Sequence, residues 1–171
     1  MLENVPRIYD VFRKFKPEWA VFVIADDRSL RRPSGMIAGW SMKCSREPPL
    51  YAVSLSKEGY TGKLIRDTGE FVVAVPNKEL EPAIRVFGRN RGDAIDKFKE
   101  SGIKTRNAKI VSAPLLEDAT INLECVLEKE VDSGDHTIFI GRVVAAYHNP
   151  EKKFMVNIGN TPEGWYEFKE F

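Results

Sequence analysis

The chain has 171 residues, with 26 Lys or Arg against 25 Asp or Glu and a net charge of +1 at pH 7. This length is typical of one domain, and the even charge balance argues against a nucleic-acid-binding surface, which needs a basic excess. The longest apolar run, Trp19–Ala25, is far shorter than the about 20 residues that a membrane-spanning helix needs. Scattered charges in the N-terminal segment break any signal-peptide core. We therefore expect a cytoplasmic protein that binds neither nucleic acid nor membrane.

The first predicted element is a short helix within residues 4–16, because Ile8, Phe12 and Phe15 fall on one face. We expect this face to dock on the body of the protein. Short strands follow, and a charged turn at residues 26–33 separates the first two. The predicted strands are residues 19–25, 35–45, 50–56, 71–75, 121–128 and 137–147, and residues 154–158 and 165–168 form a C-terminal strand or tail.

Helices are predicted to be few and short. One covers residues 61–68 and ends at Gly69, and further helical pieces in residues 79–101 are broken near Gly88–Gly92. Six or seven short strands with so few helices favour a small β-barrel over a parallel α/β sheet. Strand 137–147 is apolar on both faces apart from Arg142, so we expect a second copy of the chain to cover its outer face and form a homodimer.

The two cysteines, Cys44 and Cys125, lie far apart in apolar stretches, and we expect both to be reduced and buried. No Cys or His spacing indicates a metal site, so none is predicted. Common catalytic motifs are absent, including the glycine-rich dinucleotide and phosphate loops and the serine hydrolase elbow. The chain's two histidines, His136 and His148, accompany no nucleophile motif.

Two segments could bind a ligand in an apolar barrel. In Gly35–Trp40, glycines flanking small residues would let a flat ligand lie against the backbone, although they would equally suit a bulge at a barrel corner with Trp40 in the core. Strand 50–56 presents small and hydroxyl-bearing residues on one face, and Thr61 then opens a helix. The helix N-terminus, these hydroxyls and Lys57 would form an anion cradle, unless Thr61 only caps its helix.

Two further segments have weaker signals. Residues 85–92 carry three arginines between glycines, which fits either a phosphate clamp or a solvated loop. His136 follows a Gly-Asp turn, where it could act as an acid or base or hold a purely structural hydrogen bond.

Taken in order, these segments resemble one known family. The matching residues are Gly35–Trp40, Ser45–Leu50, Ser54–Ser56, Tyr60–Ile65, Thr68–Pro76, Asp96–Phe98 and Gly134–Gly141. This ordered set is similar to the flavin reductase-like family of FMN-binding split barrels, which includes flavoredoxins and a ferric reductase. The resemblance runs from about residue 17 to about residue 147.

The resemblance implies a mainly β fold: a six-stranded antiparallel Greek-key split barrel with a few short helices, FMN bound at a dimer interface, and NADH or NADPH as electron donor. It divides a single domain, residues 1–171, into an N-terminal helix (1–16), a barrel core (17–147) and a C-terminal segment (148–171). Met36, Ile37, Ala38, Gly39 and Trp40 would line the isoalloxazine, and Ser54, Leu55 and Ser56 the ribityl chain. Thr61, with Lys57 or with Arg89 and Asn90, would hold the phosphate, and His136 would position the nicotinamide or supply a proton.

Two departures from the family pattern affect this site. Ile37 stands where the family often has Thr, which removes a hydroxyl, and Arg91-Gly92-Asp93 replaces the usual Ser-Gly-Arg, which leaves the phosphate-binding arginine open. The sequence predicts an oxidoreductase that passes electrons from NAD(P)H through FMN to free flavin, ferric iron or a partner protein. The alternatives are a non-catalytic, flavoredoxin-type FMN electron carrier and a binding barrel without flavin, whose ligand site would be the 85–91 loop.

Overall fold

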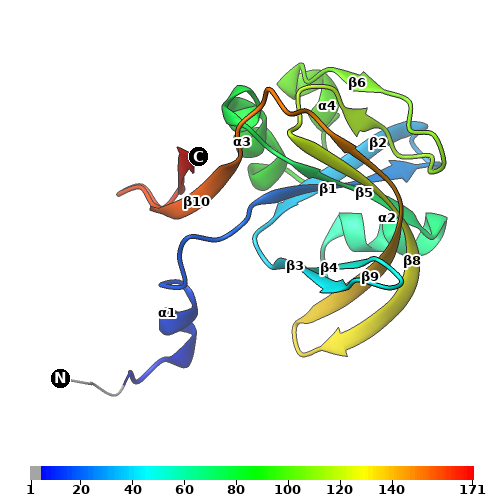
Figure 1. Ribbon diagram of the computed structural model, residues 1–171. Coiled ribbons are helices and arrows are strands. Elements are labelled where there is room, and N and C mark those ends of the chain that lie inside the picture. The colour runs from blue at the N-terminus through cyan, green and yellow to red at the C-terminus, as the bar shows by residue number, and fades with distance from the viewer. Residues whose placement is uncertain (1–4) are drawn as a thin grey trace.

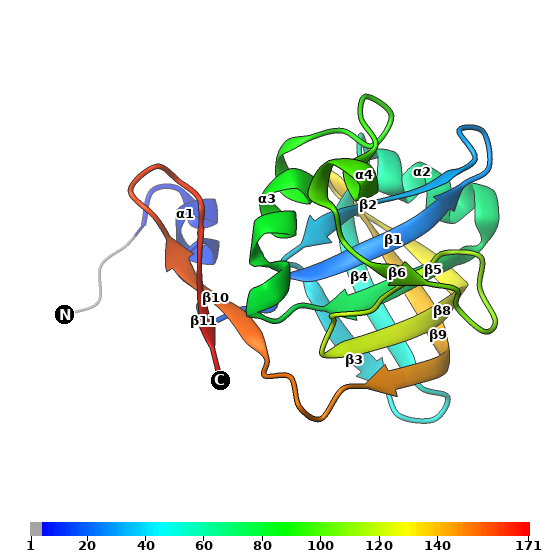
Figure 2. The ribbon, with the colours of Figure 1, turned by 90° about the horizontal axis from the view of Figure 1, so that it is seen from above.

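The computed structural model describes residues 5–171, so the start of the predicted N-terminal helix at residue 4 lies outside the described residues, as do residues 1–4 of the predicted domain. Helix α1 covers only Ile8–Phe12. Figures 1 and 2 show that it lies outside the barrel, and its apolar side chains are exposed, with Ile8 at 73% and Phe12 at 53%. The prediction that its apolar face docks on the body is therefore wrong for the single chain.

The centre of the molecule is a seven-stranded antiparallel sheet in the order β2-β1-β5-β8-β9-β4-β3 (Figure 1). The two strands at its margins, β2 and β3, are joined in the chain by two residues. The Ser54 N–H of β4 donates to the Trp40 carbonyl at this junction, at 2.8 Å. The sheet thus closes into a barrel, as predicted. The strands are β1 (Val21–Asp27), β2 (Arg32–Ala38), β3 (Ser41–Ser45), β4 (Leu50–Ser56), β5 (Glu70–Val75), β8 (Ile121–Ser133) and β9 (His136–His148).

One strand of the sequence prediction is two strands in the structure. Residues 35–45 bend at Gly39 and Trp40, so that β2 pairs with β1 while β3 pairs with β4. The predicted six strands become seven for this reason, because one continuous segment forms both margins of the sheet. The charged turn is also shorter than predicted, since the paired residues of β1 and β2 extend to Asp27 and Arg32.

Strand β1 is apolar throughout because each of its faces packs against a core. Val21 and Val23 point into the barrel interior with Leu55 and Phe139, and this core also takes up residues of α2 (Tyr60–Thr68). Phe22 and Ile24 belong to a second core beneath α3 (Glu81–Arg89), and their positions alternate with those of the interior residues. This confirms the prediction of a strand buried on both sides.

Short elements complete the fold. A 3-10 turn (Lys78–Leu80) leads into α3, and α4 (Lys97–Ser101) ends at Gly102, whose φ of +65° is the left-handed conformation of a helix C-cap. Strands β6 (Thr105–Arg106) and β7 (Leu115–Leu116) form a small sheet, and β10 (Met155–Asn160) pairs with β11 (Tyr166–Glu170) in a C-terminal hairpin instead of a single strand or tail.

The C-terminal hairpin lies next to α3, on the same side of the barrel as α1 (Figure 2). It is tied to the chain before β1 by reciprocal backbone hydrogen bonds between Glu18 and Asn157, each 2.9 Å. Both cysteines have free thiols, but Cys44 is exposed while Cys125 is buried, so the predicted burial is wrong for Cys44. In the described part of the chain, no helix is long and apolar enough to cross a membrane.

Candidate functional site

A cavity of about 540 Å³ opens where β2 bends into β3. This volume lies within the range of roughly 300–1,000 Å³ that is usual for ligand sites. One side, which we call the barrel wall, consists of Met36, Ile37, Ala38, Gly39, Trp40, Ser54, Ser56 and His136. The opposite side, the terminal wall, consists of Tyr9, Phe12, Arg13 and Lys16 from the N-terminal segment and Asn160, Gly164 and Tyr166 from the C-terminal hairpin.

Sheet pairing brings the barrel wall together. Ser56 in β4 lies opposite His136 in β9, and the Ser54 N–H donates to the Trp40 carbonyl. The Trp40 and His136 rings lie 4.7 Å apart with a tilt of 38°. Trp40 is 42% exposed, so it belongs to the cavity surface and not to the core. The result is an aromatic and backbone-lined surface beside two hydroxyl groups, which suits a flat aromatic ligand with a polar tail.

A hydrogen bond orients the His136 ring. Its Nδ1 lies 2.6 Å from Asp135 Oδ1. This hydrogen bond lowers the pKa of the exposed Asp135 carboxyl, so the carboxylate is ionised near neutral pH. With Nδ1 engaged, Nε2 is the ring nitrogen that can donate to or accept from a ligand.

Glu18 brings a carboxylate to the junction of the two walls, and no sequence motif predicts this. It accepts hydrogen bonds from Lys16 Nζ and from the buried Asn157 side chain, the latter at 2.9 Å. A Cβ at Gly39 would lie only 3.3 Å from Glu18 Oε1. A glycine at this position therefore allows the carboxylate to sit tightly against the bend.

Five of the predicted binding residues do not line the cavity. Leu55 is fully buried in the barrel core, as expected for the strand position between two serines. Lys57 Nζ pairs with Asp132 Oδ2 at 2.7 Å, and Thr61 is buried inside α2, whose N-cap is Gly59. Arg89 and Asn90 lie at the end of α3, where the Arg89 guanidinium covers the Trp165 ring at 3.5 Å from its centre.

The arginine that reaches the N-terminus of α2 is Arg91. Its Nη1 donates to the Glu58 carbonyl at 3.4 Å, and its other nitrogens pair with Asp93. The adjacent Gly92 packs so closely that an added Cβ would lie 1.9 Å from Ser34 Oγ. Ser34 Oγ is buried and has no hydrogen-bond partner among the described residues. An orphaned hydroxyl of this kind normally has a partner in the working protein.

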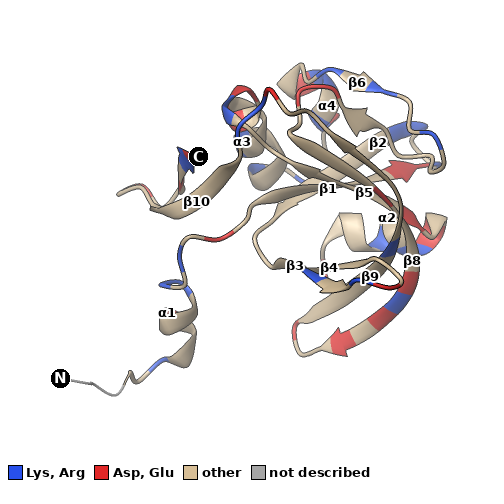
Figure 3. Ribbon diagram, viewed as in Figure 1, with Lys and Arg blue, Asp and Glu red and all other residues tan. Residues whose placement is uncertain are grey.

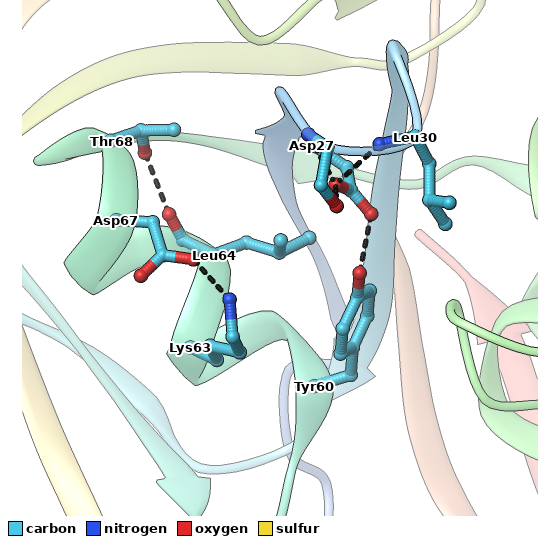
Figure 4. A network of polar contacts seen from close by, with 8 residues as sticks. Asp27, Leu30, Tyr60, Lys63, Leu64, Asp67 and Thr68 are labelled. Atoms are coloured by element: carbon cyan, nitrogen blue, oxygen red, sulfur yellow. Dashed lines mark hydrogen bonds and ion pairs between the residues drawn. The ribbon is translucent and has the colours of Figure 1, made fainter.

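Helix α2 is fixed to the β1–β2 turn by a charged hydrogen-bond network (Figure 4). The buried Asp27 carboxylate accepts from the Ser29 hydroxyl and from the Leu30 and Ser29 N–H groups, and the Tyr60 hydroxyl donates to its second oxygen. Desolvation acts to raise the pKa of Asp27, but these hydrogen bonds outweigh it and lower the pKa. The network therefore fixes the first turn of α2 relative to β2.

The Lys97 side chain connects β2 to α3 by hydrogen bonds. Its ammonium is buried and donates to the Gly35 carbonyl at 2.7 Å and to the Phe87 carbonyl at 2.8 Å. Burial lowers the pKa of Lys97 to about 8. The segment that carries the barrel wall is thus joined to α3 through one side chain.

The comparisons with known proteins agree with this geometry. Residues 17–165 match the family described as flavin reductase like domain. The chain belongs to this family. The match confirms the resemblance, the split-barrel fold and the class of function predicted with them, a flavin oxidoreductase.

Two relatives and one solved enzyme illustrate the similarity. An Archaeoglobus fulgidus protein is 35% identical over 70% of this chain and 67% of its own length. The NADH-dependent FAD reductase of Streptomyces globisporus is 30% identical over 74% of this chain and 69% of its own. The structure of the NADH:FAD oxidoreductase SgcE6 of Streptomyces globisporus C-1027 superposes with a TM-score of 0.85 at 26% identity, covering 100% of this chain and 98% of that one.

Another structure of SgcE6, in complex with NAD and FAD fragments, superposes with a TM-score of 0.82 at 25% identity, over 100% of this chain and 96% of that one. The chain spans 51% to 67% of the length of three archaeal relatives.

Proposed function

We propose that this chain binds FMN in the cavity between the barrel wall and the terminal wall and uses it to oxidise NAD(P)H. The observation that carries the proposal is the convergence of eight predicted flavin-contacting residues on one cavity of about 540 Å³. Family membership supports the flavin, and the name of the Streptomyces globisporus relative supports a nicotinamide donor. Free flavin, ferric iron or a partner protein would accept the electrons.

The barrel wall fits the isoalloxazine ring. The backbone of Ile37–Gly39 would face the ring edge, replacing the hydroxyl that Ile37 lacks, and Ser54 and Ser56 would follow the ribityl chain. When bound, the flavin supplies the redox chemistry, accepting a hydride from the nicotinamide and passing electrons to the acceptor. His136, held by Asp135, would position the nicotinamide or exchange a proton through Nε2.

For the FMN phosphate we propose the N-terminus of α2. Here Lys57 and Thr61 keep the roles that the family resemblance implies, and Arg91 replaces Arg89 and Asn90. The orphaned Ser34 hydroxyl and the Arg91 side chain, which reaches Glu58, support this choice. Arg91→Gln is then expected to weaken FMN binding, whereas Asn90→Ala is not.

We also propose that the protein is a homodimer. In β9, Thr137, Phe139 and Gly141 face the barrel interior, while the alternating Ile138 and Ile140 are only half-buried. The apolar side chains of α1 are also exposed in the single chain. Sedimentation equilibrium with and without FMN tests the dimer, and a monomer in both conditions would contradict it.

The decisive experiment begins with the visible absorption spectrum of the protein purified and then saturated with FMN. NADH or NADPH is added without oxygen, and bleaching of the flavin band is followed. Bleaching by either donor supports the oxidoreductase. If only dithionite bleaches the band, the chain is a flavoredoxin-type electron carrier, and if no flavin binds, the proposal is wrong.

A further inference from the structure

A second, smaller cavity adjoins the proposed flavin cavity and has no role in the function proposed so far. It has a volume of about 240 Å³ and lies between α3 and the C-terminal hairpin. Ile37, Gly164 and Tyr166 line both cavities, so the two adjoin. Figure 2 shows α3 and the hairpin side by side at this place. We refer to it as the side compartment.

The side compartment is an apolar slot with a cationic rim. Ile84, Trp165 and Phe168 provide apolar and aromatic surface, and Arg85 stands at its edge. Arg89, one turn further along α3, lies over the Trp165 ring. In residues 5–171, neither arginine has a carboxylate within ion-pair distance, in contrast to Arg32, Arg66, Arg91 and Arg142.

Two carboxylates moderate this positive charge without neutralising it. Glu81 borders the compartment one turn before Arg85 on α3, and Glu163 is near enough to Arg85 for the guanidinium to help lower the pKa of the Glu163 carboxyl, after a hydrogen bond from Thr161. Neither forms an ion pair with Arg85. The rim therefore keeps guanidinium donors available for an anion.

We propose that the side compartment binds the adenosine diphosphate end of a dinucleotide whose redox-active end occupies the flavin cavity. A volume of about 240 Å³ suits one ring system and is too small for a whole dinucleotide. The aromatic and aliphatic lining suits a purine, and Arg85 and Arg89 suit a pyrophosphate. FAD and NAD(P)H share this group, and SgcE6 has been solved with NAD and FAD fragments.

This inference rests on the proposed function, because it assigns a site to the adenosine diphosphate end of a dinucleotide whose redox-active end would occupy the flavin cavity. The direct probe is ADP, measured by isothermal titration calorimetry on the full chain saturated with FMN. We expect the wild type to bind ADP and Trp165→Ala to bind it about tenfold more weakly, at the lower end of what the loss of one base–aromatic stack causes. We expect Trp165→Phe to retain most of the affinity, and Arg85→Gln and Arg89→Gln each to lose about fivefold.

The matched control is Lys104→Gln, which removes the same charge from an exposed residue next to β6, and we expect it to leave ADP binding unchanged. Absence of ADP binding by the wild type at millimolar concentration, with FMN bound normally, would overturn the inference and leave the proposed function intact. Equal ADP affinity of Trp165→Ala and the wild type would also overturn it. Failure to bind any flavin would instead refute the proposed function.

Two further comparisons with Trp165→Ala identify whether FAD or NAD(P)H supplies the adenosine diphosphate group. A loss of FAD affinity with unchanged FMN affinity assigns the compartment to FAD. A raised KM for NADH, with an unchanged KM for reduced nicotinamide mononucleotide, assigns it to the donor. If Trp165→Ala changes the FAD and FMN affinities equally and also changes the two KM values equally, the side compartment does not bind a dinucleotide.

Discussion

The two walls of the proposed flavin cavity are built very differently. In the barrel wall, β4 and β9 are hydrogen-bonded to strands on both sides, whereas β2 is a margin of the sheet that pairs with β1 and is joined to α3 through Lys97. The interior core backs this wall and helps to fix its positions. The terminal wall consists of a five-residue helix and a two-stranded hairpin. The hairpin packs on the second core through Met155 and Phe168, whereas the side chains of the helix are largely exposed. Short helices and isolated hairpins have little stability of their own.

This contrast implies a division of labour. In the proposed function the barrel wall would hold the flavin ring, whereas changes in the short helix of the terminal wall would cost the fold little. The outer half of β8 carries alternating acidic and basic residues (Figure 3), and Arg66 and Arg142 pair with two of its glutamates.

The largest effect should come from the core behind the barrel wall. Phe139 is fully buried, approaches Gly62 and lies under the Arg66 guanidinium at 4.9 Å. We expect Phe139→Ala to lower the free energy of unfolding by about 3–5 kcal/mol because it leaves a cavity in a packed interior. Urea denaturation measures this loss, and a loss below about 1 kcal/mol would contradict the assigned packing.

Lys97 tests whether the support behind β2 carries a buried charge. Its folded pKa of about 8 lies below the ordinary lysine value of 10.5, so between these values the unfolded chain binds the proton that the folded chain has released. Stability therefore rises with pH across this window, by roughly 1.4 kcal/mol per pH unit at most. The free energy of unfolding of the wild type minus that of Lys97→Met should show this rise, and a flat difference would refute the buried ammonium.

Tyr60 tests the anchoring of α2. We expect Tyr60→Phe to lower the free energy of unfolding at pH 7 by about 1–2 kcal/mol, because the buried Asp27 carboxylate loses a charge-assisted hydrogen bond. The folded pKa of Asp27 is lowered, so this stabilisation is present above its unfolded pKa and is lost as pH falls through the folded value. The difference between wild type and variant should therefore shrink below about pH 4. If the difference in free energy of unfolding between wild type and Tyr60→Phe does not change with pH, the Tyr60 hydroxyl does not act through the Asp27 carboxylate.

The terminal wall should give the smallest change. Phe12 is 53% exposed and packs only edge-on against the Tyr9 and Phe15 rings. We expect Phe12→Ala to change the free energy of unfolding by less than about 0.5 kcal/mol in the FMN-free monomer. The urea series used for Phe139→Ala provides the comparison, and similar losses in the two variants would remove the distinction between the walls.

The sequence predicted the barrel wall better than the terminal wall for a physical reason. Alternation in strand 50–56 and the small residues at Gly35–Trp40 are local patterns, and pairing with β9 places His136 beside them once the barrel forms. The terminal wall instead depends on contacts between residues far apart in the chain, such as Glu18 with Asn157. No local periodicity encodes contacts of that kind.

The other differences have similarly specific causes. The glycines of Gly35–Trp40 suited either a bulge at a barrel corner or the approach of a flat ligand, so the pattern alone did not separate a bent pair of strands from one long strand. Cys44 lies in an apolar stretch, but β3 is a marginal strand whose side chains Met42 and Cys44 face outward. The choice of Arg91 as the proposed phosphate-binding arginine depends on where the loop after α3 crosses α2, and sequence spacing does not determine that crossing.

The bend at Gly39 and Trp40 has a consequence for folding. Because the same short segment completes the cylinder of strands and forms the mouth of the pocket, the chain cannot finish its tertiary structure without creating its ligand site. Substitutions that relax this corner should therefore weaken cofactor retention and resistance to denaturant together, in proportion.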